Sequence, residues 1–436
     1  MNDSTTQSEV TPSVCCWVGL DWADKKHHLA VRTQPSKPAQ EYQVEQQPEK
    51  LDEFFLNLRA QHPAGLIAVG IEQSRGPVIY ALMKFDFLLL YPINPRALSD
   101  YRGAFKISGA KDDHLDADLL CELVAQHADR LRPLVVEDAT TRQLRLLTEA
   151  RRHFVEERTA CINQLQATLK CYYPLALELV GEGLTSKLAG DFLRRFPNLA
   201  KLQAAKPSVL RAFFYDHNSR SEDRISARLE SIKTARPLTE DPALVEPYQL
   251  RMVCLVAQIS TLNKTIEQYD ERIQKVFATH SLKELFSALP GAGPALAPRL
   301  AAVFGTNRSN YQKALDVLSF TGVAPVRKQS GNSQTVHFRY ARPIFLHQTL
   351  VEFAKCSLPR CAWARLLFEH ELGKGKTKWS AIRKVAFKWI RILWRCWQNN
   401  EAYDEAKYLQ SLKQHSATLY RSLYEPAAPS LQNSSQ

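Results

Sequence analysis

The sequence has no long uninterrupted apolar run. A helix that spans a membrane needs about 18 or more apolar residues in succession. The longest apolar stretch, Phe85–Ile93, is strand-sized and includes Asp86 and Pro92. The first residues also lack the basic segment and apolar core of a secretory signal. We therefore expect a cytoplasmic protein with no membrane partner.

The sequence also lacks the cysteine patterns that bind zinc. It contains nine cysteines, but they form no CxxC pair and no Cys/His cluster with zinc spacing. An odd number of cysteines without a secretory signal indicates reduced, mostly buried thiols. Neither a zinc site nor a disulfide framework is expected to hold the fold together.

Acidic residues are too few to balance the basic ones. Among 436 residues, Lys and Arg number 57 and Asp and Glu number 45, a formal net charge of +12. Such an excess is typical of proteins whose partner is a polyanion, so nucleic acid is the first candidate. Hydrophobic residues make up 45% and charged residues 23%, which excludes wholesale disorder and a fibrous repeat. At about 150 residues per domain, the length accommodates two or three domains.

The N-terminal third alternates between apolar runs and amphipathic segments. The predicted strands are Val14–Asp21, His28–Thr33, Glu41–Val44, Leu66–Glu72 and Phe87–Ile93, and the predicted helices are Leu51–Arg59 and Val78–Lys84. Three antiparallel strands followed by α/β alternation is the element order of the ribonuclease H-like (RNase H-like) fold, which places a mixed sheet between helices. An α/β N-terminal domain of this type is therefore predicted.

The middle of the chain is predicted to be helical. Thr141–Tyr172 is one amphipathic helix ended by Pro174, and prolines divide residues 174–247 into short helices. Apolar residues then recur at spacings of four and three, as in a coiled-coil seam: Leu255, Ile259, Leu262, Ile266, Tyr269, Ile273 and Val276. This seam favours a helix that pairs with another, or equally a helix packed on the core of its own chain.

The C-terminal third is predicted to be mostly helical, with a break at residues 322–331. Its last long helix, Thr377–Trp397, interleaves basic residues, Lys384 and Lys388 among them, with tryptophans. Such a helix could grip phosphates while its rings stack, or it could turn its tryptophans to the core. The predicted organisation is a disordered leader at 1–13, the α/β domain at 14–135, a helical coiled-coil region at 136–280, a C-terminal domain at 281–424 and a disordered tail at 425–436.

Carboxylates follow two of the predicted strands. Asp21 closes the first strand and Glu72 closes the fourth, and if these strands are neighbours their carboxylates leave the same edge of the sheet. Asp113 and Asp116 are three residues apart at a predicted helix start and share a face. Converging carboxylates suit Mg²⁺ or Mn²⁺, and two such ions could act on a scissile phosphate. Each acid alone could be an ordinary surface or helix-start residue, and three nearby acids compete with them: Asp24, Asp112 and Asp118.

Two glycine-containing segments of the C-terminal third could approach phosphates. Gly291 and Gly293, in LPGAGPALAPRLAAVFG, indicate a helix-hairpin-helix-like turn whose backbone amides meet a phosphate, although a ligand-free turn between helices has the same glycines. Downstream, Ser330 stands beside Gly331 in a predicted loop. The basic residues near it are Arg327, Lys328, Arg339 and Arg342. A serine there could attack a phosphodiester, but no activating elbow or histidine partner accompanies it, so composition alone makes it a loop serine.

These motifs resemble those of the IS110-type insertion-sequence transposases, relatives of the Piv-type DNA invertases, over nearly the whole chain. The matching stretches are VGLDWADKKHHLAV, GIEQSRG, YPINPRALSDYRGAFKISGAKDDHLDADLL, LPGAGPALAPRLAAVFG, LSFTGVAPVRKQSG, and RYARPIFLHQTLVEFA with AIRKVAFKWIRILWRCW. Their order and spacing make a coincidence very improbable.

The resemblance implies roles for particular residues. The four metal-binding acids of a RuvC-like domain fall on Asp21, Glu72, Asp113 and Asp116, because the family places its acids third and sixth in KDDHLD. The family's nucleophilic serine falls on Ser330. Ser333 is its local rival.

The resemblance also implies an activity. A transposase of this type cuts one DNA strand, links the 5′ phosphate to serine and exchanges strands without net hydrolysis. A non-coding bridge RNA pairs with donor and target DNA, and the protein assembles as dimers of dimers in which the acids of one protomer meet the serine of another. Two other activities fit the acids, a Piv-type invertase and a junction-resolving nuclease with a passive Ser330. A further alternative is an inactive, nucleic-acid-binding remnant.

Overall fold

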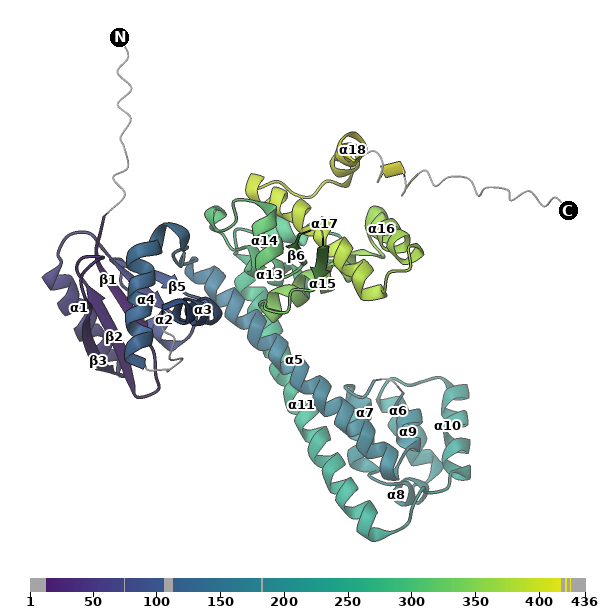
Figure 1. Cartoon of the computed structure of the whole chain (residues 1–436). Helices are drawn as coiled ribbons and strands as arrows, with labels where there is room; N and C mark the ends of the chain where they lie inside the picture. Colours follow the sequence, from purple (N-terminus) through teal and green to yellow (C-terminus); the bar gives the residue numbers. More distant parts are fainter. Residues whose placement is uncertain are drawn as a thin grey trace. The chain divides into compact units, whose positions relative to one another are not determined.

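The computed structural model describes residues 13–73, 75–105, 113–181, 183–331, 333–416, 420–421 and 424. The chain divides into two compact units, which adjoin between Val136 and Glu137. The first unit is an α/β domain and the second is mainly helical (Figure 1).

The first unit is built on a five-stranded mixed sheet with the strand order β3-β2-β1-β4-β5. The strands are β1 (Val14–Asp21), β2 (Lys26–Arg32), β3 (Gln40–Glu45), β4 (Leu66–Ile71) and β5 (Leu88–Pro92). The first three pair antiparallel, and β1, β4 and β5 run parallel. This arrangement confirms the predicted RNase H-like order of strands.

Helices cover both faces of the sheet, as the continuous apolar character of its central strands requires. These helices are α1 (Pro48–Gln61), α2 (Pro77–Leu82), α3 (Pro95–Phe105) and α4 (Asp113–His127). Side chains of α1 and α2 share one core cluster with β1 and β4. Those of α3 and α4 form another cluster with the opposite face of β4 and β5. Separate cores on its two faces therefore hold the sheet between two layers of helices.

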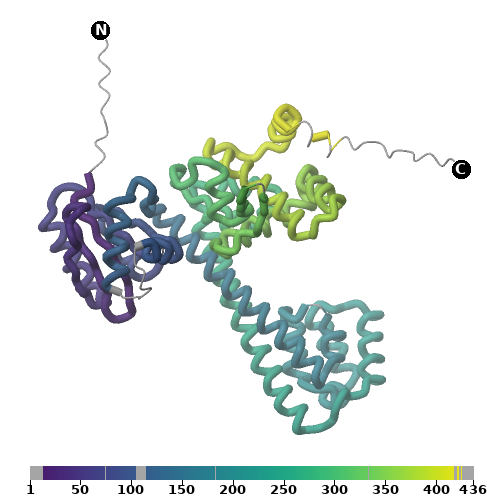
Figure 2. The backbone as a smooth tube through the Cα atoms, viewed as in Figure 1, coloured from purple at the N-terminus to yellow at the C-terminus, as the bar shows by residue number. Residues whose placement is uncertain are grey.

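Two long helices, α5 (Ala139–Tyr172) and α11 (Pro242–Ala278), lie side by side in the second unit (Figure 2). Between them in sequence come five short helices: α6 (Leu175–Val180), α7 (Lys187–Arg195), α8 (Leu199–Gln203), α9 (Pro207–Asp216) and α10 (Glu222–Thr234). The prediction of short helices is confirmed, but its C-terminal limit is wrong. Helix α11 begins at Pro242 and continues through Pro247, which has no N–H and therefore forfeits one helical hydrogen bond.

The predicted seam lies on α11 and packs within the chain. Leu255 and Ile259 are buried in a core shared with the C-terminal end of α5 and the short helices. Ile273 and Val276 are buried in the core of the C-terminal region. Between them, Tyr269 meets Phe154 of α5 with a ring-centroid distance of 5.3 Å. Of the two interpretations of the seam, packing inside its own chain is therefore the one observed.

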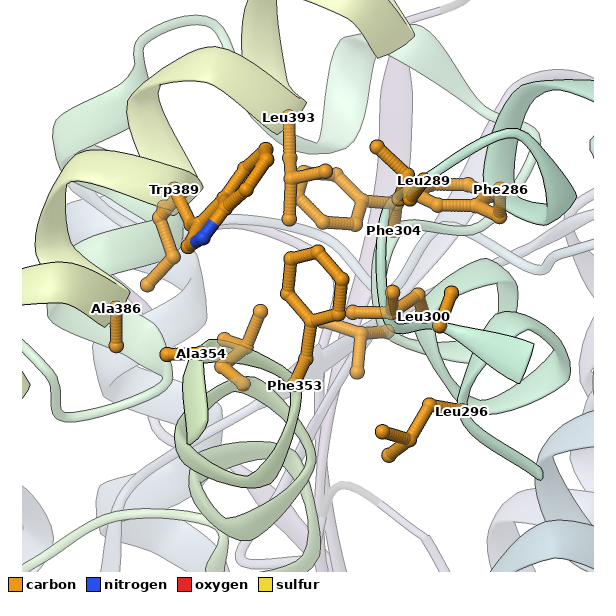
Figure 3. Close-up of a cluster of buried hydrophobic side chains, with 14 of the residues drawn as sticks. Phe286, Leu289, Leu296, Leu300, Phe304, Phe353, Ala354, Ala386, Trp389 and Leu393 are labelled. Atoms are coloured by element: carbon orange, nitrogen blue, oxygen red, sulfur yellow. The ribbon is translucent and has the colours of Figure 1, made fainter. Parts of the chain in front are cut away.

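The C-terminal region packs helices around one apolar core. Its elements are α12 (Lys283–Ser287), α13 (Gly293–Phe304), α14 (Ala314–Phe320), β6 (Val326–Ser330), β7 (Ser333–His337), α15 (Ile344–Ser357), α16 (Ala362–Gly373), α17 (Lys378–Asn399) and α18 (Glu405–His415). Figure 3 shows Phe304 of α13, Phe353 of α15 and Trp389 of α17 converging in this core.

The tryptophans of α17 mostly face this core. Trp389 and Trp397 are fully buried, and their indole N–H groups donate to Ser357 Oγ at 2.8 Å and to the Gly305 carbonyl at 2.7 Å. Each buried ring therefore has its polar atom satisfied, as burial requires. These rings belong to the fold and are not available for stacking on bases. Trp379, by contrast, is 56% exposed.

The helices and the cysteines can be compared with the sequence predictions of no membrane span and of reduced, mostly buried thiols. No helix in the described ranges is long and apolar enough to cross a membrane. All nine cysteines are free thiols, but Cys171, Cys254 and Cys356 are exposed and three others are half-buried. Only three of the nine, Cys16, Cys121 and Cys361, are buried, so the prediction of mostly buried thiols is wrong.

Candidate active site

Two of the predicted acids leave neighbouring strands at one edge of the sheet. The parallel register of β1 and β4 pairs Gly19 with Gly70, so two positions later Asp21 and Glu72 stand side by side. Side chains alternate along a strand, which places both carboxylates on the face of the sheet occupied by the two glycines. Both acids are half-buried.

Helix α4 covers this same face and runs opposite to β1. A Cβ atom at Gly19 would collide with the backbone of Ala117 and Cys121. The Cys121 thiol donates to the carbonyl of Trp17 at 3.3 Å. Cys121 comes one helical turn after Ala117, whereas Trp17 comes two residues before Gly19. The first turn of α4 therefore points toward the end of β1, where Asp21 stands.

The other two predicted acids belong to this first turn. Asp116 is 3% exposed, and its carboxylate forms an ion pair with Arg102 of α3. Asp113 begins α4, but its side chain lies outside the described part of the structure. The fold thus brings Asp21, Glu72 and the first turn of α4, which contains Asp116, to one region of the first unit.

The chemistry of these side chains suits a hard cation, because carboxylate oxygens are the ligands that Mg²⁺ and Mn²⁺ prefer. Among the described residues, which leave out the Asp113 side chain, no group of three or more His, Cys, Asp or Glu is arranged to hold a metal ion. In this structure the Arg102 guanidinium is the cation that balances Asp116.

The three competing acids differ from this set. The Asp118 carboxylate is bound to Arg32 at 2.6 Å, and Arg32 stands opposite Trp17, four residues from Asp21 on β1. Asp24 is exposed in the turn between β1 and β2. Asp112 lies outside the described residues. Neither Asp24 nor Asp118 is therefore a better candidate than the four predicted acids.

The break predicted at residues 322–331 contains a β-hairpin that sequence reasoning missed. Strand β6 pairs antiparallel with β7, and Ser330 stands opposite Ser333. Ser330 is thus the last residue of a strand, where a loop was predicted, and Gly331 makes the turn with a φ of +54°. The pair Ser330-Gly331 between two short polar runs was the available signal.

Ser330 lies on a shallow basic hollow of the hairpin. The hollow measures about 530 Å³ and is lined by Arg327, Lys328, Gln329, Ser330, Ser333 and Thr335, all exposed. Two cations beside three hydroxyls can receive a phosphate group. The predicted partners Arg327 and Lys328 are therefore near Ser330.

The other two predicted arginines are more constrained. The Arg342 guanidinium donates to the carbonyls of Arg339 at 2.7 Å and Tyr340 at 3.2 Å, and it lies 4.3 Å from the ring centroid of Phe338. Arg339 is half-buried, and its Nε has no hydrogen-bond partner in the described structure. Arg327 and Lys328 are therefore more accessible to a phosphate at Ser330.

The two glycines of the predicted helix-hairpin-helix turn have different surroundings. Gly291 has a φ of +89°, and a Cβ there would collide with the backbone of Cys356 and Ser357 at the end of α15. Gly293 has a φ of +55° and open space where its Cβ would be. Close helix packing therefore accounts for Gly291, whereas Gly293 leaves the start of α13 accessible.

The two predicted lysines of α17 also differ. Lys384 is exposed and Lys388 is half-buried. Burial lowers the pKa of Lys388, and the neighbouring charges of Arg391 and Lys384 lower it further. Lys384 is therefore the better placed to meet a phosphate.

Comparison with known proteins identifies the class. Residues 18–174 match the model of a DEDD-type transposase. Residues 283–368 match the model of the IS116/IS110/IS902 transposase family. The chain is thus a transposase, an enzyme class that acts on DNA. It belongs to the IS110 family, with a DEDD N-terminal domain and the C-terminal domain typical of that family.

Several curated proteins are similar along most of their length. The mini-circle putative transposase for IS117 of Streptomyces coelicolor is 25% identical over 93% of this chain and 99% of that protein. An uncharacterized 42 kDa protein of insertion element IS900, from Mycobacterium paratuberculosis, is 23% identical over 89% of this chain and 97% of its own length. The putative transposase y4uE of Sinorhizobium fredii is 30% identical over a smaller share, 38% of this chain and 46% of that protein.

Proposed function

We propose that this transposase cuts and rejoins DNA strands at the ends of its insertion sequence, with Ser330 as the nucleophile and Asp21, Glu72, Asp113 and Asp116 as ligands of Mg²⁺ or Mn²⁺. The observation that carries the metal site is the register of β1 and β4, which sets Asp21 beside Glu72 under the first turn of α4. DNA is inferred as the substrate because the chain belongs to a family of transposases.

Ser330 is proposed to form a covalent link to DNA. Its Oγ gives up its proton and attacks the scissile phosphorus, the bond from phosphorus to the 3′ oxygen breaks, and the 3′ oxygen takes up a proton and leaves as a hydroxyl, so one proton is released and one is consumed. The phosphodiester bond to the 3′ oxygen is replaced by a phosphodiester bond to serine, so little free energy is lost. The 3′ hydroxyl of another strand can therefore attack the serine-linked phosphate and join a new strand. Arg327 and Lys328 would hold the phosphate oxygens during the attack.

The acids are proposed to serve the same reaction from the first unit. A bound divalent cation would neutralise phosphate charge and favour the deprotonated form of an attacking hydroxyl. Asp21 and Glu72 would orient it from the sheet edge, and Asp116 would do so from α4 after exchanging Arg102 for the metal. Gly293, Lys384 and, less directly, Lys388 are proposed to contact the DNA backbone.

The RNA and oligomer proposals rest on the family resemblance. We infer a bridge RNA that pairs with donor and target DNA, and an assembly of dimers in which the acids and the serine come from different protomers. The seam of α11 does not support the assembly, because Leu255, Ile259, Ile273 and Val276 are buried in cores of the same chain. The proposed domains keep the limits 14–135, 136–280 and 281–424, and the proposed location is the cytoplasm, where the DNA of a bacterial element lies.

The decisive experiment looks for a protein-DNA adduct. The full chain is expressed with its native flanking DNA, reactions are stopped with SDS, and nuclease-resistant adducts are measured. We expect an adduct in the wild type and in Ser333→Ala, which removes the rival hydroxyl, and none in Ser330→Ala or Asp21→Asn.

Other outcomes identify other activities. An adduct that persists in Ser330→Ala moves the nucleophile elsewhere. Free 5′ phosphates without an adduct indicate a junction nuclease, and inverted products indicate a Piv-type invertase. Binding of the element ends in Mg²⁺ without any cleavage indicates an inactive remnant.

A further inference from the structure

An exposed aromatic surface lies at the base of the Ser330 hairpin. We call this set of residues the aromatic surface: Phe338, Tyr340, Arg342, Trp379 and Arg383. Tyr340 is 83% exposed and Trp379 is 56% exposed. Large rings usually pack inside a protein or at an interface, so two of them in water beside cations indicate a binding surface.

The rings and cations of this surface are in contact. The guanidinium carbons of Arg342 and Arg383 lie 4.3 Å and 5.1 Å from the ring centroid of Phe338. Tyr340 meets Phe338 edge to face at 5.2 Å. Trp379 is one helical turn before Arg383 on α17 and therefore shares its face of the helix. The contact of Arg383 with Phe338 thus joins the end of the hairpin to α17, and the two segments together supply rings and positive charge.

This combination is chemically suited to a single-stranded nucleic acid. Unpaired bases stack on exposed rings, whereas the bases of a duplex are already stacked on each other. Guanidinium groups attract the phosphates and can lie over aromatic rings. A protein partner of ordinary composition would not require both features, and the excess of Lys and Arg over Asp and Glu in this chain favours a polyanion.

The hairpin relates the aromatic surface to Ser330. Ser330 stands opposite Ser333, and five residues of extended chain separate Ser333 from Phe338, about 16 Å at 3.3 Å per residue. That length corresponds to roughly five base steps at 3.4 Å each. A strand whose phosphate lies at Ser330 can therefore reach the rings within about five nucleotides.

We propose that the aromatic surface stacks unpaired bases of the DNA strand whose scissile phosphate lies at Ser330, and so holds that strand between cleavage and rejoining. The proposal rests on the proposed function of Ser330. It adds the state of the substrate: the strand is unpaired within about five nucleotides of the cut.

The test measures binding to three probes. The full-length protein is titrated with a labelled 20-nucleotide oligo(dT), with the matching dA·dT duplex and with a 20-nucleotide oligo(rU), all at one salt concentration. Tyr340→Ala and Trp379→Ala are expected to weaken oligo(dT) binding about fivefold or more each, since base stacking on one ring contributes that much. Duplex binding should change less than about twofold, because paired bases offer no free faces.

Matched variants separate stacking from general surface effects. Tyr340→Phe keeps the ring and should bind oligo(dT) like the wild type. Leu315→Ala removes another large apolar side chain, 60% exposed on α14, and should have no effect. Oligo(dT) should also quench the emission of Trp379, measured as the difference between wild type and Trp379→Phe.

Three outcomes overturn the proposal. If Tyr340→Ala and Trp379→Ala weaken binding to oligo(dT) and to the duplex equally, the surface contributes no stacking. Weakening confined to oligo(rU) assigns the surface to RNA. Unchanged binding with a change in molar mass by light scattering makes it an interface between copies of this chain.

Failure of the proposed function would look different. If wild-type protein forms no adduct at Ser330 but the ring variants still lose oligo(dT) binding, the serine chemistry is wrong and the single-strand surface stands without its link to the cut. If the adduct forms and depends on Ser330 while the ring variants bind normally, the aromatic surface alone is rejected.

Discussion

Arg102 of α3 forms an ion pair with Asp116 of α4, and their side chains are only 17% and 5% exposed. Removing a charge from water is costly, and the mutual attraction of the pair offsets that cost. Loss of either partner leaves the other as an uncompensated buried charge. The pair therefore fixes α3 to the turn of α4 that carries two of the proposed metal ligands.

We expect Arg102→Ala to lower the free energy of unfolding by on the order of 3 kcal/mol, measured by urea denaturation. Arg96→Ala is the control on the same helix, since Arg96 is 89% exposed and pairs with Asp100 at 4.0 Å; its effect should stay below about 1 kcal/mol. Equal effects of the two variants would contradict the assigned role of the Arg102 pair.

The absence of a side chain at Gly19 allows α4 to pack closely on the sheet. We expect Gly19→Ala to displace α4, because the new Cβ would collide with the helix backbone, and so to abolish adduct formation and lower the thermal midpoint. Gly103→Ala is the control, since its Cβ meets no atom within 4 Å and alanine favours the helix by about 1 kcal/mol. An active, stable Gly19→Ala variant would show that the helix position does not matter.

The glycines at 291 and 293 are expected to respond differently to alanine. Gly293→Ala should cost about 1 kcal/mol, the strain of a left-handed residue in open space. Gly291→Ala has the same strain and a collision with the end of α15, so its thermal midpoint should fall further. Calorimetry of both variants measures the difference, and a larger loss for Gly293→Ala would refute it.

The lowered pKa of Asp138 is expected to make the stability of the fold depend on pH. Burial alone would raise its pKa, but hydrogen bonds from Thr141 and Thr306 outweigh burial and lower the pKa from 3.8 to about 2. The carboxylate therefore stabilises the fold above about pH 4, and this contribution is lost as the pH falls toward about 2.

At pH 7 we expect Asp138→Asn to unfold about 1 kcal/mol more easily than the wild type, because an NH₂ group replaces the carboxylate oxygen that accepts hydrogen bonds from the Thr141 and Thr306 hydroxyls. In urea titrations the difference should shrink steadily below about pH 4. Asp129→Asn is the control, since the Asp129 side chain is 75% exposed, and it should match the wild type throughout. A difference for Asp138→Asn that grows toward low pH would show that the sign is wrong.

Metal binding should stabilise the first unit. A cation that binds the folded state raises the thermal midpoint with its concentration, so we expect Mg²⁺ to raise it in the wild type and not in Asp21→Asn or Glu72→Gln. Asp24→Asn, a change at an exposed competitor, should keep the response. An unchanged Mg²⁺ response in Asp21→Asn would place the cation elsewhere.

The order of strands in the first unit could be predicted from local pattern, because buried strands must be continuously apolar and a period of two or 3.6 residues distinguishes strand from helix. The acids at the ends of β1 and β4 follow from the same reasoning. The hairpin β6-β7 could not be found in this way, because nearly all of its residues are exposed and no buried face imposes an alternation.

The sequence by itself determined which faces of its helices are apolar, where the strands of the first unit run and which carboxylates end two of them, because these depend on neighbours a few residues away. Only the tertiary structure decided what covers each face. The α11 seam packs on α5, Trp389 and Trp397 of α17 enter the core, Asp116 meets Arg102, and Gly291 lies under α15. These partners are distant in sequence, and a periodic pattern states that a face is buried without stating against which segment.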